Sequence, residues 1–234
     1  MKAIYRRELH AYFTTPIGYT YMVFYFLLSG AVFAYTTLFS MTSDVTAYFS
    51  LMLLAISVLL PLLTMKLLSE EKRQKTEQVW LTAPVPVFSV VVGKFLAAYT
   101  LFAGTRLFSS LAFLLLYAYG EVKTAVLLGN LFALLLVGAV FIAVGLFTSA
   151  ITENQLASAV GTVGILLGFL AVSFLAELVN VYWIRFILNG LSVYTRFRNF
   201  SLGVFDVSAL VYYLSLTFLF LFFTVRVYDR RRYL

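Results

Sequence analysis

Long apolar runs, separated by short polar stretches, make up most of the chain. A membrane-spanning helix needs roughly 20 consecutive apolar residues. Five runs of about this length carry no Lys, Arg, Asp or Glu: Ile17–Leu38, Tyr48–Met65, Ala125–Ile151, Leu156–Ala176 and Val207–Val225. A sixth run, about Phe88–Tyr119, is apolar except for Lys94 near its start and Arg106 inside it. The pattern predicts an all-α polytopic membrane protein whose six transmembrane helices form one domain over residues 1–234.

One charged stretch, Ser69–Pro86, interrupts this pattern between the second and third apolar runs. Glu71 and Lys75 stand four residues apart, in the order that favours an ion pair on one face of a helix. Thr76 is a candidate N-cap for a second short helix, which ends before Pro84. The stretch is therefore long enough to form helices of its own, which a simple connection between two spans does not need.

The second of these short helices carries an apolar group, Val79, Trp80 and Leu81. A solvated charged loop would explain the charges of this stretch, but it would not explain an exposed Trp–Leu pair bounded by prolines. We therefore predict that residues 69–87, called the docking segment below, bind a partner.

Lys and Arg residues near the ends of the runs are distributed unevenly. Twelve lie at the N-terminus, between the second and third runs, or at the C-terminus, and four lie on the other side. Because cytoplasmic loops are enriched in Lys and Arg, both termini and the docking segment are predicted to be cytoplasmic. The net charge of +7 is then explained by basic flanks that lie against anionic lipid, without nucleic acid as a partner.

Two other segments have the composition of a membrane interface. In the first, Tyr5, Leu9 and Phe13 recur at helical spacing opposite basic residues, so residues 1–16 are predicted to form an amphipathic helix at the inner interface. In the second, residues 177–206, arginines alternate with aromatic side chains, which favour the interfacial region. An ordinary interfacial loop and a re-entrant segment both fit the second composition, and its length and apolarity favour the re-entrant one.

The composition argues against catalysis by this chain. Its residues are 62% hydrophobic and 12% charged, and it has no cysteine and one histidine, His10. Disulfides and Cys-ligated metals are therefore excluded. The chain has no clustered carboxylates and no phosphate-binding loop of the form G-x-x-x-x-G-K-[ST]. We expect no catalytic residue, no metal site and no cofactor in this chain, so that any energy comes from a partner or from an ion gradient.

Arg106 is a charge within a predicted span. It lies twelve residues after Lys94, which is about 18 Å along a helix and too deep for easy access to the inner surface. Such charges face a protein interior or an aqueous path. Three roles are open: hydrogen bonding to carbonyls or to a polar residue such as Ser109 or Asn130, contact with an anionic group of a substrate, or reach to the outer surface.

Small residues gather in the fifth span, at Gly161, Gly164 and Gly168. Such spacing is typical of close helix packing in membranes. The partner helix belongs either to the same chain or to a second copy, in which case these glycines mark a dimer interface.

Three stretches carry a family resemblance. The first is RRELHAYFTTPIGY, residues 6–19, and the second is the charged stretch with the start of the third span. The third precedes and includes the last span. In them the chain resembles the ABC-2 permease family, the membrane subunits of type 2 ABC exporters, and in particular its small six-span members of gliding-motility and related systems. The matching positions are Glu71, Thr76, Glu77, Leu81, Pro84, Gly93, Lys94, Phe197, Phe200, Gly203, Asp206 and Tyr213. One departure is Lys75, where that family often carries Gly.

The resemblance implies roles for these segments. Thr76–Pro84 would be a coupling helix seated in a groove of a separate ATPase subunit, and residues 177–206 would form short re-entrant helices near the exit. The ATPase-coupling residues would be Glu71, Thr76, Glu77, Trp80, Leu81 and Pro84. The outer segment would use Phe197, Phe200, Gly203 and Asp206.

The resemblance also implies an assembly. Two permease chains, identical or related, would pair above two ATPase subunits, which hold the ATP and Mg²⁺, and would export a substrate across a bacterial cytoplasmic (inner) membrane. An accessory extracytoplasmic subunit is compatible with this architecture. The alternatives are an ion-coupled secondary transporter, which would want ionisable residues near the midplane, and a membrane scaffold subunit without transport activity. The identity of the substrate stays open.

Overall fold

The computed structural model describes residues 1–234 except 83–84, 120–122, 180, 202, 204–205 and 233–234. Its described part consists of helices and connections, with no strand. The helices are α1 (Lys2–Thr14), α2 (Pro16–Phe33), η1 (Ala34–Phe39), α3 (Thr46–Thr64), α4 (Ser69–Arg73), α5 (Glu77–Thr82), α6 (Val87–Ser109), η2 (Ser110–Phe113), α7 (Leu114–Tyr119), α8 (Thr124–Ile151), α9 (Gln155–Leu178), α10 (Tyr182–Leu191), α11 (Val193–Ser201) and α12 (Val207–Arg232).

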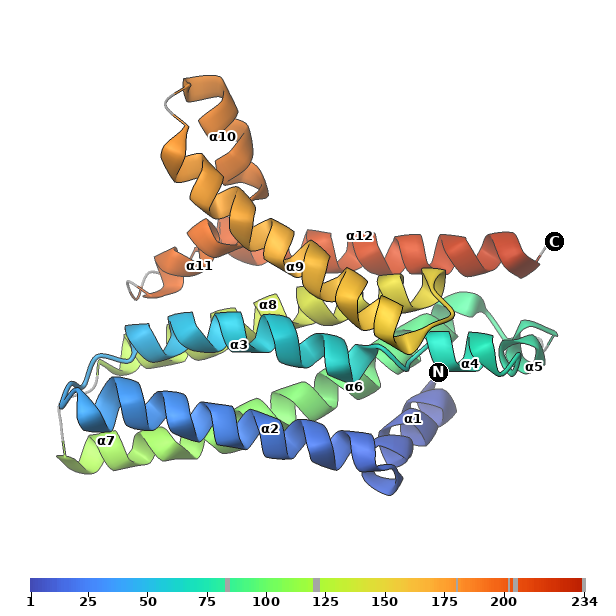
Figure 1. The fold of residues 1–234 in the computed structure, drawn as a ribbon, viewed down its shortest axis with the longest axis horizontal. Helices are drawn as coiled ribbons and strands as arrows, with labels where there is room; N and C mark the ends of the chain where they lie inside the picture. Colours follow the sequence, from blue (N-terminus) through green and yellow to red (C-terminus); the bar gives the residue numbers. More distant parts are fainter. Residues whose placement is uncertain (83–84, 120–122, 180, 202, 204–205, 233–234) are drawn as a thin grey trace.

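Six helical stretches in this described part are long and apolar enough to cross a membrane. They are Pro16–Phe39, Thr46–Arg73, Val87–Tyr117, Thr124–Ile151, Gln155–Ala176 and Val207–Arg231. The prediction of an all-α, multi-pass membrane protein is confirmed at this level. Figure 1 shows α2, α3, α6, α8 and α12 running roughly along the long axis, with the N- and C-termini and α4 and α5 at the same end.

Helix α8 lies at the centre of the bundle and is the most deeply buried of the six stretches. It packs against α3, α6, α9 and α12. Two of its glycines allow this close approach, because a Cβ at Gly138 would collide with the ring of Phe102, and one at Gly145 would collide with Thr64. Small residues at such contacts let helix backbones come together without a polar side chain to hold them.

Helix α1 precedes the first span and packs against α6 and α2. Its end is set by Thr15, which is extended, and by Pro16, which starts α2 at the position where a helix tolerates proline. Tyr5 of α1 donates its hydroxyl to Thr100 Oγ1 of α6 at 3.1 Å. The predicted helix within residues 1–16 is therefore present, and its place at a membrane interface stays a prediction.

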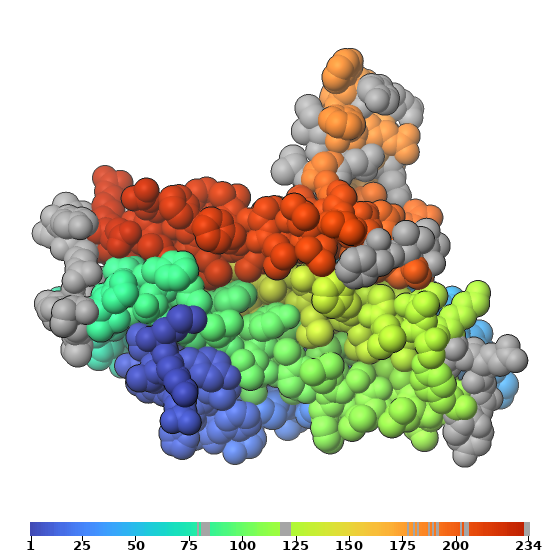
Figure 2. Space-filling model, turned by 180° about the vertical axis from the view of Figure 1, so that it is seen from behind, coloured from blue at the N-terminus to red at the C-terminus, as the bar shows by residue number. Residues whose placement is uncertain are grey.

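The fifth stretch departs from the direction of the others. Figure 1 shows α9 leaving the bundle obliquely, with α10 folded back beside its far end, and Figure 2 shows the same arm rising beside α12 when seen from behind. Helix α11 returns to the bundle and packs on α8 and α9. Residues 177–206 thus contain helices, as expected, and their re-entry into a bilayer stays a prediction.

Candidate functional site

Four charged side chains meet at the end of the bundle where the docking segment lies, and we call them the ion cluster: Arg7, Glu8, Glu71 and Lys94. Lys94 of α6 is almost completely buried, with 1% of its side chain exposed. Its Nζ lies 2.8 Å from Glu71 Oε1 and 3.1 Å from Glu8 Oε1. Arg7 Nη2 completes the cluster at 2.6 Å from Glu8 Oε1 and 3.1 Å from Glu71 Oε1. The cluster therefore joins α1, α4 and α6.

The charges of this cluster are balanced, with two cations and two carboxylates. Burial alone would raise the pKa of Glu8, but the nearby Lys94 and Arg7 outweigh it and hold that pKa below its ordinary value of 4.5. The hydrogen bond to Glu8 likewise raises the pKa of Arg7. Removing one member of such a buried group leaves an uncompensated charge, which costs about 3–5 kcal/mol in comparable ion pairs. Lys94 is the most deeply buried member of the cluster, so this cost applies most fully to its charge.

Glu71 also connects the two short helices of the docking segment. Its second oxygen, Oε2, accepts a hydrogen bond from Trp80 Nε1 of α5 at 3.1 Å. The ring of Trp80 lies 5.0 Å from the ring of Tyr228 on α12. Arg231 Nη1, also on α12, lies 3.6 Å from Glu77 Oε2. Helix α5 is therefore fixed to α12, and Trp80 is half-buried inside the chain instead of being the exposed apolar residue that the sequence predicted.

The turn between α4 and α5 depends on Lys75. Its φ of 56° lies in the left-handed region that favours glycine. The amide of Thr76 donates to Glu71 O at 3.0 Å and that of Lys75 donates to Lys72 O at 3.1 Å, which is the pattern of a Schellman helix end. Lys75 therefore occupies the position after the helix where glycine is commonest. This conformation gives a physical reason for the Gly that the ABC-2 family often carries here.

The predicted ion pair between Glu71 and Lys75 is wrong. Helix α4 ends at Arg73, so Lys75 lies beyond it and its exposed side chain forms no ion pair with another described residue. Glu71 turns instead toward Lys94 and Arg7. Thr76 does precede a short helix, but its hydroxyl donates backward to Glu71 O at 3.4 Å. The side chain of Leu81 and all of Pro84 lie outside the described residues.

Ser149 of α8 holds the junction between α3 and α4. Helix α3 ends at Thr64, and the amides of Leu68 and Ser69 both donate to Ser149 Oγ, at 3.0 and 2.9 Å. Ser149 Oγ in turn donates at 3.1 Å to Met65 O, which also accepts from Ser69 Oγ. One hydroxyl thus satisfies two buried amides, each of which would cost about 1–3 kcal/mol if left unpaired. The docking segment is attached to the core of the bundle at this point.

Arg106 lies in the last turn of α6 and is fully buried. Its Nη1 donates to Tyr48 Oη of α3 at 3.0 Å, and its guanidinium carbon lies 4.8 Å from the centre of the Phe49 ring. Its Nε and Nη2 have no hydrogen-bond partner in the described part of the chain. A guanidinium over an aromatic ring gains about 2 kcal/mol when desolvated. The position fits a structural role within the protein interior, one of the three roles that the sequence left open.

The partners expected for Arg106 are different from those found. Ser109 belongs to the same polar chain but one step away, because Ser29 bonds to both Tyr48 Oη, at 2.7 Å, and Ser109. Asn130 lies elsewhere and accepts a hydrogen bond from Ser201 at 2.8 Å. The expectation of a direct bond to Ser109 or Asn130 is therefore wrong.

The outer segment places its four candidate residues in structural positions. Phe197 and Phe200 of α11 are buried against the bundle. Gly203 has a φ of 76°, which a residue with a side chain adopts only with strain. Asp206 caps α12 by accepting from the Ser208 amide at 2.9 Å. The hydrogen bond from Asn199 holds the pKa of Asp206 below its ordinary range.

The three glycines of α9 face away from the rest of the chain. A Cβ built at Gly161, Gly164 or Gly168 would meet no atom within 4 Å. Their packing partner is therefore not in the described part of this chain, whereas Gly138 and Gly145 of α8 are used for packing inside it. The sequence had left these two alternatives open.

Several residues at the docking end were not predicted to take part. The residues that contact the docking segment or belong to the ion cluster without having been predicted are Glu8, Ser149, Tyr228 and Arg231. A signal was available only for Glu8, because it is an acidic residue in an otherwise basic N-terminal helix. The others became visible only when the fold brought distant parts of the chain together.

Comparison with known proteins gives no family assignment. No family model matches the chain, and no curated protein matches it. The function is therefore argued from the residues and their geometry.

Proposed function

We propose that this chain is the transmembrane permease subunit of an ATP-binding cassette exporter. A separate ATPase subunit docks on residues 76–84 and drives a substrate outward across a bacterial inner membrane. The observation that carries the proposal is the attachment of the docking segment, whose two short helices are joined by Glu71 to α1 and α6 and by Trp80 to α12. A segment that only connects two spans has no need of such attachments.

The attachments provide a route for movement. A displacement of α5 by the ATPase acts on α12 through the Trp80–Tyr228 contact, whose ring centres are 5.0 Å apart, and on Glu71 through the 3.1 Å hydrogen bond from Trp80. Glu71 passes the displacement to α6 through Lys94. In this mechanism the chain contributes positioning, and the ATP and Mg²⁺ belong to the partner ATPase.

The finer architecture of the proposal follows the family resemblance. Both termini and the docking segment are cytoplasmic, α1 lies at the inner interface, and α10 and α11 form the re-entrant segment near the exit. Two permease chains pair above two ATPase subunits, and the open glycine face of α9 is one surface on which a second permease could pack.

The buried Arg106 does not favour an ion-coupled carrier. Such a carrier needs a group within the membrane that gains and loses a proton or binds the coupling ion. A guanidinium stays protonated and has no acceptor atom, so Arg106 meets neither need. A scaffold subunit without transport activity differs from an exporter in having no ATPase partner, and the experiment below distinguishes the two.

The test is purification of the tagged chain from its native membrane, followed by identification of stoichiometric partners. We expect an ATPase with a phosphate-binding loop, whose ATP hydrolysis changes when the two are reconstituted together. The charge reversals Arg73→Glu and Lys75→Glu alter exposed positions of the docking segment and should greatly reduce recovery of the ATPase. Arg185→Glu, in the outer segment, is the matched control and should leave recovery unchanged. Recovery of no ATPase, or equal recovery with all three variants, would refute the proposed docking.

A further inference from the structure

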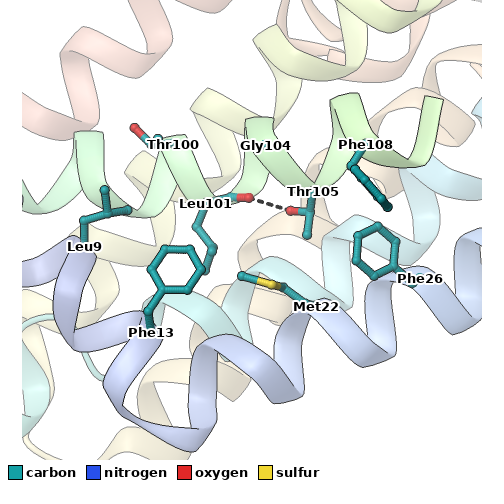
Figure 3. A pocket seen from close by; sticks show the side chains of 9 residues that line it. All are labelled: Leu9, Phe13, Met22, Phe26, Thr100, Leu101, Gly104, Thr105 and Phe108. Atoms are coloured by element: carbon teal, nitrogen blue, oxygen red, sulfur yellow. Dashed lines mark hydrogen bonds between the residues drawn. The ribbon is translucent and has the colours of Figure 1, made fainter. Parts of the chain in front are cut away.

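An apolar groove opens on the surface of the bundle between α1, α2 and α6. Figure 3 shows the side chains of Leu9 and Phe13 of α1, Met22 and Phe26 of α2 and Phe108 of α6 around it, with the backbone of Gly104 in its wall. Its volume is about 530 Å³. The two hydroxyl groups at its wall belong to Thr100 and Thr105, and both are engaged in hydrogen bonds to carbonyls of α6. The groove is therefore lined by hydrocarbon, because both threonine hydroxyls are already hydrogen bonded.

Along α6 the groove runs from Thr100 to Phe108. These residues are eight positions apart, which is about 12 Å along the helix, or about two fifths of the roughly 30 Å hydrocarbon core of a bilayer. A second hollow of about 460 Å³ also has Thr100 in its wall and extends to Lys2 near the N-terminus. The groove and this hollow follow one another along the contact of α1 with α6, and together they are called the depression below.

The end of this depression near the N-terminus is positively charged. Lys2 lines the second hollow, and Arg6 lies one helical turn later on the same side of α1 and is exposed. Neither forms an ion pair with another described residue, whereas the next residue, Arg7, pairs with the carboxylates of Glu8 and Glu71 in the ion cluster. Two uncompensated cations therefore stand at the polar end of an apolar groove.

We propose that this groove is a binding site for one anionic phospholipid of the inner leaflet. An acyl chain lies between Phe13, Phe26 and Phe108, and the phosphate lies against Lys2 and Arg6. The combination of a hydrocarbon-lined depression and a cationic end matches an amphiphile with a negatively charged head group. The assignment to the inner leaflet rests on the cytoplasmic N-terminus of the proposed function, whereas the preference for an anionic lipid does not depend on export or on an ATPase.

Charge also argues against a second copy of the chain as the occupant. In a symmetric dimer the same patch of both chains is buried, and two chains that cross the membrane in the same direction would bring Lys2 and Arg6 of both to the same end of the interface. Four cations would then gather in one place without a partner anion. An anionic lipid removes this conflict, because each added Lys or Arg strengthens its binding.

Gly104 allows the acyl-chain part to be tested without disturbing the fold. It lies in the groove, and a Cβ there would meet no atom within 4 Å. Gly104→Leu therefore puts a branched side chain into the space assigned to the lipid. Gly30 of α2 is equally open but does not line the groove, which makes Gly30→Leu the matched control.

The experiment is native mass spectrometry of the purified full chain, titrated with palmitoyl-oleoyl phosphatidylglycerol or with the corresponding phosphatidylethanolamine. The wild type should bind one phosphatidylglycerol roughly tenfold more tightly than phosphatidylethanolamine, as two cations near an anionic lipid would give. Lys2→Gln/Arg6→Gln should remove the preference, and the control Arg226→Gln/Arg230→Gln should keep it. Gly104→Leu should weaken binding of both lipids, and Gly30→Leu should not.

Two results would overturn the proposal. One is equal binding of the two lipids by the wild type, or a preference for phosphatidylglycerol in the Lys2/Arg6 variant that is as strong as in its control. The other is a dimer in the same spectra that Gly104→Leu dissociates, because the groove would then be an interface between chains. If Gly104→Leu fails to fold, the comparison of the two double charge variants still decides the question.

Discussion

The ammonium of Lys94 lies 2.8 Å from a carboxylate oxygen of Glu71, although the two residues belong to different helices and Lys94 is almost wholly buried. Glu71 also accepts from Trp80 with its other oxygen. One carboxylate therefore links the third span to the helix on which a partner is proposed to dock. Three of the predictions below concern the charged side chains of Lys94, Glu8 and Arg106, and one concerns the backbone conformation of Lys75.

Lys94→Met should destabilise the fold by about 3 kcal/mol, because it leaves the two carboxylates of Glu8 and Glu71 to share the single charge of Arg7. Thermal unfolding in detergent measures the loss. Adding Glu8→Gln to Lys94→Met should recover part of it. Glu153→Gln is the control, because that carboxylate is 68% exposed in its pair with Lys72, and removing it should cost less than about 1 kcal/mol. Equal losses for Lys94→Met and the control would contradict the buried cluster.

Acid should weaken the attachment of α1 through Glu8. Its folded pKa is below the ordinary 4.5 because Lys94 and Arg7 outweigh its burial. The unfolded chain therefore takes up this proton at higher pH than the folded chain does. The stabilisation is complete above pH 4.5 and is lost as the pH falls through the lower folded value. Melting temperatures between pH 7 and pH 3.5 should fall less for Glu8→Gln than for the wild type, and parallel curves would argue against the assignment.

Lys75→Gly should stabilise the turn between α4 and α5 by about 1 kcal/mol, because a left-handed conformation costs a residue with a side chain 1–2 kcal/mol and glycine almost nothing. Lys75→Val should destabilise it, since a branched Cβ is least compatible with positive φ. The free energy of unfolding of both variants, with the exposed Arg73→Gly as a control inside α4, measures the effect. A loss of stability in Lys75→Gly would show that the side chain contributes more than the backbone conformation costs.

Tyr48→Phe should destabilise the membrane part by about 2 kcal/mol, because it removes the only hydrogen bond that the described structure gives to the charged Arg106 side chain. Arg106→Met should be nearly neutral or stabilising, since exchanging a buried charge for an apolar side chain removes the cost of burying it. The double variant should therefore be more stable than Tyr48→Phe alone. A large loss in Arg106→Met would instead indicate that the charge itself is needed, and a transport assay would then be the next measurement.

The spans were predictable because a bilayer imposes a length and an apolar composition on each of them. The charges of the docking segment were visible too, but their partners were not. Local spacing favoured Lys75 for Glu71, whereas a helix end at Arg73 moved Lys75 off the helix and left Glu71 for Lys94. Glu8 and Lys94 are 86 residues apart, and only the packing of α1 on α6 brings them together. The spacing of residues along one helix does not reveal which side chains meet between two different helices.

The hydroxyl of Ser149 binds peptide groups at positions 65, 68 and 69 and none of their side chains. Substitutions at those three positions leave the groups that Ser149 recognises in place, provided that the new residue is not proline. These hydrogen bonds therefore constrain the residue at position 149, where a small hydroxyl-bearing side chain must fit beside another backbone. Positions 68 and 69 are constrained in a different way, because both residues are fully buried and Ser69 Oγ donates to Met65 O. A substitution at 149 thus removes hydrogen bonds to the peptide groups, whereas one at 68 disturbs packing and leaves those bonds available.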